Sequence, residues 1–478
     1  MEARTIFQNI SPIDHRYSIS EKAVYEALVP WISEEASIRA CVKAEIALIC
    51  AHLAMRGKIT PAIRAEFEKI TVDPADVYAE EEKTSHNIRA LVNVLKRKIP
   101  PEFAPLVHLG ATSVDILDTS LSWRMAGVTR EAALPLLKKL ELLLCDFAER
   151  EAETPQVGRT HGQHAVPITL GFAIAEYVSR LGKSILEIEK RSKELKGKLS
   201  GAVGAYNATS MIVKDPLELE RIYLAELELE PSEHSTQLAE PEYLLRLLLE
   251  YNVAFGIIAN LADDLRNLQR SEIGEVREGF AADQVGSSTM PQKRNPWNSE
   301  HVKSLWKAFM PRVNTFFMDQ ISEHQRDLTN SASQRFIADY IAGFCLAVSR
   351  MTGVMQGLDA DRERLLANLL GGNIPGGIMA EPAYILLAET GVSDAHEVIR
   401  KITLAAEKEK ISFAAALSKE PVMLAKISGK LAELGLIANS SEVVSFFEKP
   451  QRYSGIAAKK AKSLAQKYRK LMGATKNV

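Results

Sequence analysis

The loop from Gly286 to Pro296 holds the densest set of chemically useful side chains in this sequence. Its residues, GSSTMPQKRNP, combine a glycine, adjacent serines, a lysine, an arginine, an asparagine and two prolines. Glycine supplies a hinge and proline limits what the hinge can do, as in loops that close over a ligand. Hydroxyl, ammonium and amide donors in one loop could enclose an anion. The pattern predicts a mobile, electropositive lid, and an ordinary polar connection between helices is the alternative.

The end of this loop is typical of a helix start. Asn295 is a short polar residue suited to the N-cap, and Pro296 suits the first helical position. The dipole at a helix N-terminus favours negative charge, so the predicted helix would add to the anion site.

The segment from Gly158 to Gly171, GRTHGQHAVPITLG, is a second candidate site, because histidine can act as an acid or a base near neutral pH. His161 and His164 both precede Pro167 and a long predicted helix, so we expect them close to a helix start. Two histidines that simply cap this helix are the alternative.

The segment from Val107 to Thr119, VHLGATSVDILDT, is a third candidate. Thr112 and Ser113 place adjacent hydroxyls before a predicted helix that Asp115 could help to start. A plain helix cap without contact to a ligand is the alternative.

The segment HQRDLTNSASQR presents Arg326, Ser331 and Arg335 on what we expect to be one helical region. Two arginines and a hydroxyl are suited to clamp a phosphate, because guanidinium binds phosphate oxygens in bidentate fashion. A solvated helix with surface salt bridges is the alternative for a segment of this composition.

The elements that must position these side chains are helical. Apolar residues from Ile174 to Ile188 recur in alternating steps of four and three, and similar patterns run from Tyr251 to Leu265 and from about Gln334 to Met355. Alternating strand patterns are scarce. We therefore predict an all-α protein with three helical domains: an N-terminal domain at residues 1–109, a central long-helix bundle at 110–370 and a C-terminal domain at 371–478.

The surface of this bundle and the C-terminal tail give two further expectations. Long bundle helices carry more apolar surface than one chain covers, which favours association between chains. The Lys/Ala-rich tail, AAKKAKSLAQKYRK, is expected to form a solvated helix face.

Composition narrows the class of protein. Of 478 residues, 46% are hydrophobic and 25% are charged, as in soluble globular proteins, and the net charge of -2 offers no basic surface for nucleic acid. Four cysteines lie in apolar segments without CxxC spacing, which favours reduced core thiols over a disulfide or zinc framework. The opening MEARTIFQNISP lacks the apolar core of a secretory signal, and we expect no apolar run long enough to cross a membrane. A cytoplasmic enzyme is the expectation.

Together these motifs resemble the signatures of the fumarase/aspartase superfamily. The loop matches its pattern GSSxMPxKxNP, and the second and third candidate segments resemble its other two signatures. Members split a C–N or C–O bond by elimination and release fumarate. The resemblance implies a homotetramer whose active sites are each built from segments of three subunits.

The resemblance also implies roles for individual residues. Ser287 matches the base that abstracts the proton, His161 the general acid, and Glu300 the carboxylate that orients this histidine. Lys293 would stabilise the carbanion. His86 completes the implied catalytic set and matches the histidine of a Thr-x-His-Asp motif, in which Asn87 replaces the usual aspartate.

Within the superfamily, the chain resembles the adenylosuccinate lyases. The pattern RD…S…R matches their phosphate-binding segment, SPIDHRY matches their Arg-Tyr pair, and STQ and GAVGAYNA match further segments. The substrate-contacting residues implied are Arg16, Tyr17, Thr84, Ser85, His108, Thr112, Ser113, Thr160, Gln237, Ser288, Met290, Asn295, Arg326, Ser331 and Arg335.

This resemblance implies a carbon–nitrogen lyase of purine biosynthesis with a small-molecule nucleotide as substrate. It would release fumarate from adenylosuccinate, giving AMP, and from succinyl-aminoimidazole-carboxamide ribotide, giving the carboxamide AICAR. No metal or organic cofactor is called for. An argininosuccinate lyase is one alternative, although it has no nucleotide phosphate for the two arginines to bind. A catalytically silent structural homologue is the other, and the presence of Ser287, His161, Lys293 and Glu300 together argues against it.

Overall fold

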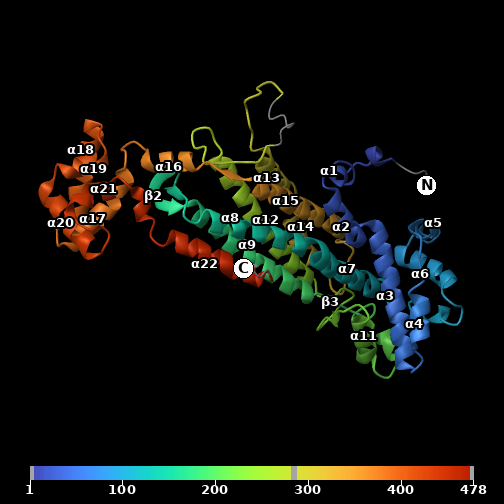
Figure 1. Ribbon diagram of the computed structural model, residues 1–478. Helices are drawn as coiled ribbons and strands as arrows, with labels where there is room; N and C mark the ends of the chain where they lie inside the picture. Colours follow the sequence, from blue (N-terminus) through green and yellow to red (C-terminus); the bar gives the residue numbers. More distant parts are fainter. Residues whose placement is uncertain (1–4, 281–287, 474–478) are drawn as a thin grey trace. The chain divides into compact units, whose positions relative to one another are not determined.

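The computed structural model describes residues 5–280 and 288–473, and helices dominate it, which confirms the all-α prediction. Figure 1 shows the course of the chain. The α-helices are α1 (Ser18–Ser20), α2 (Lys22–Ile32), α3 (Glu34–Met55), α4 (Pro61–Phe67), α5 (Pro74–Thr84), α6 (Asn87–Lys98), α7 (Ser113–Val128), α8 (Leu134–Arg150), α9 (Leu170–Lys193), α10 (Asn207–Ser210), α11 (Pro216–Ala225), α12 (Glu242–Leu268), α13 (Trp297–Phe309), α14 (Arg312–Asp319), α15 (Ile337–Gly357), α16 (Arg362–Leu370), α17 (Ala380–Glu389), α18 (Ala395–Glu409), α19 (Phe413–Ser418), α20 (Pro421–Glu433), α21 (Val443–Phe447) and α22 (Ala457–Leu471).

Short turns of other helical types join them. The 3₁₀ turns are η1 (Ile6–Gln8), η3 (Ala104–Leu106), η5 (Ser333–Phe336), η6 (Gly377–Met379), η7 (Ser440–Glu442) and η8 (Pro450–Tyr453), and the π turns are η2 (Ile13–Tyr17) and η4 (Thr129–Ala133). The three long apolar patterns of the sequence correspond to α9, α12 and α15, as their helical periods predict.

Three small strand pairs occur among the described residues. β1 (Pro155–Thr160) pairs antiparallel with β2 (Gln163–Thr169), β3 (Lys196–Gly197) pairs parallel with β4 (Glu230–Pro231), and β5 (Val276–Arg277) pairs antiparallel with β6 (Asp359–Ala360). The first pair corrects the expectation that His161 lies close to a helix start. His161 and Gly162 have φ values of 53° and 74°, and they turn the chain back into β2 before α9 begins.

The described chain divides into two compact units, each built from three stretches of sequence. One comprises Met1–Lys138, Lys183–Ala259 and His301–Arg350, and the other comprises Lys139–Gly182, Asn260–Glu300 and Met351–Val478. The division into domains at 1–109, 110–370 and 371–478 stays a prediction.

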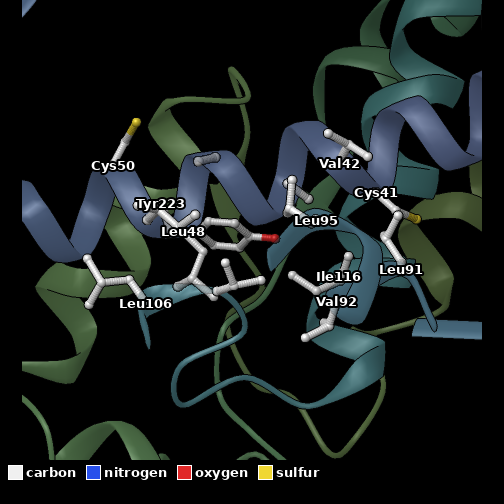
Figure 2. Close-up of a cluster of buried hydrophobic side chains, with 14 of the residues drawn as sticks. Cys41, Val42, Leu48, Cys50, Leu91, Val92, Leu95, Leu106, Ile116 and Tyr223 are labelled. Atoms are coloured by element: carbon white, nitrogen blue, oxygen red, sulfur yellow. The ribbon is translucent and has the colours of Figure 1, made fainter. Parts of the chain in front are cut away.

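Helix α3 is the centre of the core of the first unit. Ser33 caps its start by accepting the N–H of Ala36 at 3.1 Å, and α3 packs against α7 and α11. Figure 2 shows buried side chains of this core, among them Leu48 and Tyr223. Because α3 is buried on several sides, its apolar residues do not follow a single helical stripe.

The second unit has its own core in the C-terminal helices α17 to α21, drawn in orange to red in Figure 1. Buried residues such as Met379, Phe413 and Phe447 fill it. The C-terminal helix α22 corrects the expectation of a merely solvated tail, since Ala461, Ala465 and Tyr468 are buried along one face while its lysines cover the other.

Two expectations from composition concern membrane-length apolar runs and the state of the cysteines. The helical stretches Glu242–Leu268 and Ser333–Gly357 are long and apolar enough to cross a membrane, which corrects the expectation that no such run exists. Most of each apolar stretch, 56% and 72% respectively, is buried inside the protein, as in core helices of soluble proteins. All four cysteines are free and buried, which confirms their interpretation as reduced core thiols.

Candidate active site

The Thr112–Ser113 pair lies at the start of α7 as predicted, and its contact with substrate stays a prediction. Thr112 is the N-cap, and its N–H donates to Oδ2 of Asp115 at 2.7 Å in a reciprocal capping box. Asp115 is fully buried and also accepts the ammonium of Lys198 and the N–H groups of Ser200 and Gly201 at 3.2 and 3.3 Å. The GATS segment is therefore fixed to the GAVGAYNA segment through one buried carboxylate.

His108 is held in a fixed position by Glu45 of α3. The backbone N–H of His108 donates to Oε2 of Glu45 at 2.9 Å, and Nδ1 of its ring lies 2.6 Å from Oε1. His108 has a φ of 61°, a left-handed conformation that costs a residue with a side chain about 1–2 kcal/mol. The double contact with the buried Glu45 offsets that cost, and the His108 side chain remains 23% exposed.

The STQ segment, Ser235 to Gln237, lies against two other predicted motifs. The N–H of Gln237 donates to the carbonyl of Gln325 in the HQRD segment at 3.4 Å, and Ala239 donates to Asp118 of α7 at 3.0 Å. A side chain at Gly204 would come within 1.8 Å of the Ser235 carbonyl, so only glycine permits this approach. Four segments that are remote in sequence thus meet in one unit.

The carboxyl group of Asp118 in this cluster has a shifted pKa. Burial raises the pKa of its carboxyl to about 6, and the N–H of Ala239, Lys198 and Arg326 act in the opposite direction. The cluster contains a cavity of about 70 Å³, lined in part by Asp118, Tyr243 and Asn330. Ligand pockets usually measure about 300–1,000 Å³, so this cavity by itself does not enclose a nucleotide. A second cavity, of about 570 Å³, lies along α3 and is lined by none of the predicted site residues.

The segment with Arg326, Ser331 and Arg335 is not one helical region, which corrects that prediction. The carboxylate of Asp327 accepts the N–H groups of Glu323 and Thr329, both at 2.9 Å, and so takes donors that a helix would use. Only Arg335 lies in a helical turn, the 3₁₀ turn η5.

The two arginines of this segment have different surroundings. Arg326 lowers the pKa of Asp118, whereas Arg335 lowers the pKa of Tyr78 on α5, which burial and then Glu34 raise to about 12. No hydrogen bond among the described residues joins the side chains of Arg326, Ser331 and Arg335, and the Nε–H of Arg326 donates to the carbonyl of Asp327 at 2.9 Å.

The TSHN segment forms the corner between α5 and α6. Thr84 is the last residue of α5, Ser85 turns the chain with a φ of 50°, and His86 caps α6 by accepting the N–H of Arg89 at Nδ1. Asn87, which stands in place of the family aspartate, accepts the N–H of Ile88 at 2.7 Å. His86 is exposed.

Tyr17 has a partner that the sequence did not suggest. Its hydroxyl lies 2.8 Å from Nε2 of His301, and the two rings meet edge to face with centroids 5.8 Å apart. Arg16 is exposed beside it, on the π turn η2. His301 directly follows Glu300, and this adjacency is the one signal in the sequence that could have drawn attention to it.

In the second unit, a buried carboxylate holds the hairpin that carries Thr160 and His161. Glu275 accepts a hydrogen bond from Gln156 at 2.8 Å and pairs with Arg159 at 2.5 Å. Thr160 and His161 lie at the turn between β1 and β2, where both are exposed. The hairpin base is therefore rigid, and its tip presents the histidine outward.

The described part of the signature loop begins at Ser288, so Gly286 and Ser287 lie outside the described residues. Ser288, Met290 and Lys293 are exposed, and the N–H of Lys293 donates to the carbonyl of Met290 at 3.0 Å. Asn295 is partly buried.

The helix after the loop starts one residue later than predicted, at Trp297 of α13. The carboxylate of Glu278 accepts the N–H groups of Asn298 and Ser299 at 3.2 and 2.8 Å. This corrects the expectation that the helix N-terminus adds to the anion site, since an anion of the same chain already occupies it. Glu300 is exposed, and no hydrogen bond or ion pair within the described ranges joins it to His161.

Comparison with known proteins decides the family. The family described as Lyase matches residues 14–308, and the family described as Adenylosuccinate lyase C-terminal matches residues 322–436. The adenylosuccinate lyase of Pyrococcus abyssi is 34% identical over 415 residues, which cover 84% of this chain and 88% of the relative. That of Archaeoglobus fulgidus is 31% identical over 426 residues, which cover 86% of this chain and 90% of the relative.

The chain belongs to the adenylosuccinate lyase family. Solved structures support the all-helical fold of this family member. A fumarate lyase from Mesorhizobium sp. BNC1 matches with a TM-score of 0.77 at 22% identity, over 93% of this chain and 97% of that one. The 3-carboxy-cis,cis-muconate lactonizing enzyme of Pseudomonas putida matches with a TM-score of 0.77 at 24% identity, over 94% and 98%.

Proposed function

We propose that this lyase cleaves adenylosuccinate to AMP and fumarate, and succinyl-aminoimidazole-carboxamide ribotide to AICAR and fumarate. The observation that carries the proposal is the cluster in which the GATS, GAVGAYNA, STQ and HQRD segments meet around Asp115 and Asp118. The GAVGAYNA, STQ and HQRD segments resemble those of adenylosuccinate lyases, the GATS segment resembles the first superfamily signature, and together they bring Thr112, Gln237 and Arg326 into one region. An argininosuccinate lyase is not favoured by the family match.

The reaction assigned to the site is a β-elimination. Ser287, as its alkoxide, removes the proton from the carbon next to a carboxylate, and the C–H electron pair becomes the double bond of fumarate. Lys293 and Asn295 stabilise the doubly charged carbanion that forms on the way. The C–N electron pair leaves with the nitrogen of AMP, which takes a proton from His161 as general acid. Glu300 orients this histidine.

The nucleotide side of the substrate is assigned to the first unit. Arg326, Ser331 and Arg335 would bind the phosphate, with guanidinium groups suited to its oxygens. Arg16 and Tyr17 would contact the same nucleotide. His86 is assigned to the catalytic residues, and the remaining substrate contacts are assigned to Thr84, Ser85, His108, Thr112, Ser113, Thr160, Gln237, Ser288 and Met290.

The complete site is proposed to form in a homotetramer, with each site drawn from three subunits. The exposure of His161 and Glu300 in one chain, and the lack of a described contact between them, support this arrangement. The proposal also includes a cytoplasmic location and a small nucleotide as ligand. It includes no role for nucleic acid or membrane.

Release of fumarate tests the proposal directly. Purified protein is incubated separately with adenylosuccinate and with argininosuccinate, and fumarate is followed in each. We expect fumarate from adenylosuccinate alone. Fumarate from argininosuccinate would overturn the assignment of the substrate, and no fumarate from either would favour a catalytically silent homologue.

A further inference from the structure

The contact between Tyr17 and His301 joins two segments that lie 284 residues apart in the sequence. Tyr17 ends the π turn η2 and follows Arg16, one of the residues assigned to the nucleotide. His301 lies in the first turns of α13, directly after Glu300. This side-chain contact therefore connects the proposed nucleotide-binding segment to helix α13. The same helix carries Glu300, which is proposed to orient the general acid His161.

The groups around His301 determine whether its imidazole is charged in this contact. Burial, then Arg350 and then Arg16 lower the pKa of His301, so the imidazole is neutral at neutral pH. A neutral imidazole can accept the hydroxyl proton of Tyr17 at Nε2. It also adds no third positive charge beside the two arginines.

Other side-chain contacts anchor the neighbouring residues Asp14 and Glu21 and do not involve the Tyr17 hydroxyl. Glu21, at the start of α2, accepts the hydroxyl of Ser349 at 2.9 Å and pairs with Arg350 at 3.3 Å. Asp14 accepts the hydroxyl of Tyr25 at 3.4 Å. Among the described residues, the hydrogen-bond partner of the Tyr17 hydroxyl is His301.

We propose that His301 is a positioning residue for nucleotide binding. By fixing the ring and hydroxyl of Tyr17, it fixes the turn that presents Tyr17 and Arg16 to the nucleotide. The inference rests on the proposed function, in which Arg16 and Tyr17 contact AMP. Loss of the contact should weaken nucleotide binding and leave the chemical step nearly unchanged.

The test uses the full chain and three variants, His301→Phe, Tyr17→Phe and the double variant. Binding of AMP is measured by titration calorimetry, and KM and kcat are measured with adenylosuccinate. His301→Phe should raise the Kd for AMP and the KM by about 3- to 10-fold, the scale of one neutral hydrogen bond, with kcat within about twofold. The double variant should raise the Kd and KM by less than the product of the two single-variant fold-increases, because the two residues act through one contact.

Two further variants separate positioning from general damage. His301→Gln keeps a hydrogen-bonding group and should recover part of the lost AMP affinity. The exposed His396 meets Tyr384 edge to face in the C-terminal helices, with ring centroids 5.6 Å apart, so His396→Phe makes the same substitution in a similar ring pair away from the site and should leave Kd and KM unchanged.

The outcomes distinguish this inference from the proposed function. Multiplicative effects of the two single variants, or a fall in kcat at unchanged KM, would overturn the role of His301. Failure of the wild-type protein to cleave adenylosuccinate would instead overturn the proposed function. The contact between Tyr17 and His301 would then be tested through stability. The thermal unfolding midpoint is measured for both single variants and the double variant, and a double-variant shift equal to the sum of the single shifts would refute the contact.

Discussion

Loss of one partner of the buried ion pair between Lys198 and Asp115 should be among the most destabilising single changes in the first unit. Both side chains have 0% exposure, and the carboxylate also accepts the N–H groups of Thr112, Ser200 and Gly201. Lys198→Met keeps the length of the side chain but leaves the carboxylate without its counter-charge. Breaking one side of a buried pair costs about 3–5 kcal/mol. Because three backbone donors still bind the Asp115 carboxylate, we expect Lys198→Met to lower the free energy of unfolding by about 3 kcal/mol, the lower end of this range.

Lys196 offers a matched control two residues away. It pairs with Glu230 at 2.6 Å, but the Glu230 side chain is 80% exposed, so Lys196→Met should cost at most about 1 kcal/mol. The free energy of unfolding is compared by urea titration at one protein concentration, with the oligomeric state of each variant checked first. Since Asp115 also starts α7 and holds Thr112, Lys198→Met should raise the KM for adenylosuccinate as well.

A double variant tests the same buried pair in a second way. In Lys198→Met combined with Asp115→Asn no unpaired charge remains, so part of the lost stability should return relative to Lys198→Met alone. Equal losses for Lys198→Met and Lys196→Met, or no recovery in the double variant, would refute the view that Asp115 depends on its buried cation.

Four further predictions address the site. Ser287→Ala should leave AMP binding nearly intact and lower kcat by roughly 10²–10⁴, whereas Ser288→Ala should cost much less in the same assay; the reverse order would contradict the assignment of the base. Arg335→Met should weaken binding of the phosphorylated substrate by about 1.5–3 kcal/mol per charged hydrogen bond lost, and an equal loss for a substrate without its phosphate would remove Arg335 from the clamp. Inactive His161→Ala and Ser287→Ala proteins, dissociated, mixed and renatured, should regain part of the activity if the two residues come from different subunits; hybrids that native mass spectrometry detects but that stay inactive would place both in one chain. Burial raises the pKa of Asp118 from 3.8 to about 6, so the folded state holds more protons than the unfolded state between these values, and stability should fall as pH rises through this window. Asp118→Asn should flatten that fall in thermal unfolding measured from about pH 4 to 7, and an unchanged profile would show that another group is responsible.

Features that depend on neighbours in the sequence were predictable. The reciprocal cap between Thr112 and Asp115 spans three residues, so the sequence contains all of its chemistry. The helical periods of α9, α12 and α15 are likewise local patterns.

Two of the corrected predictions show why local patterns can mislead. The segment around His161 turns through left-handed residues into a hairpin, and its short strands carry no strong alternation. The segment around Arg326 is not helical because the carboxylate of Asp327 takes N–H groups on both sides of it. In both cases a few backbone hydrogen bonds outweighed helix propensity.

The sequence by itself determined the family, the all-helical character and the residues of the proposed chemistry, since these follow from residue types at fixed short spacings. Only the tertiary structure decided which distant residues support them. Glu45 holds His108 across 63 positions, and His301 holds Tyr17 across 284. Such partners meet because whole helices pack against one another, and the packing depends on buried surfaces contributed by many elements at once rather than on any spacing that one segment contains.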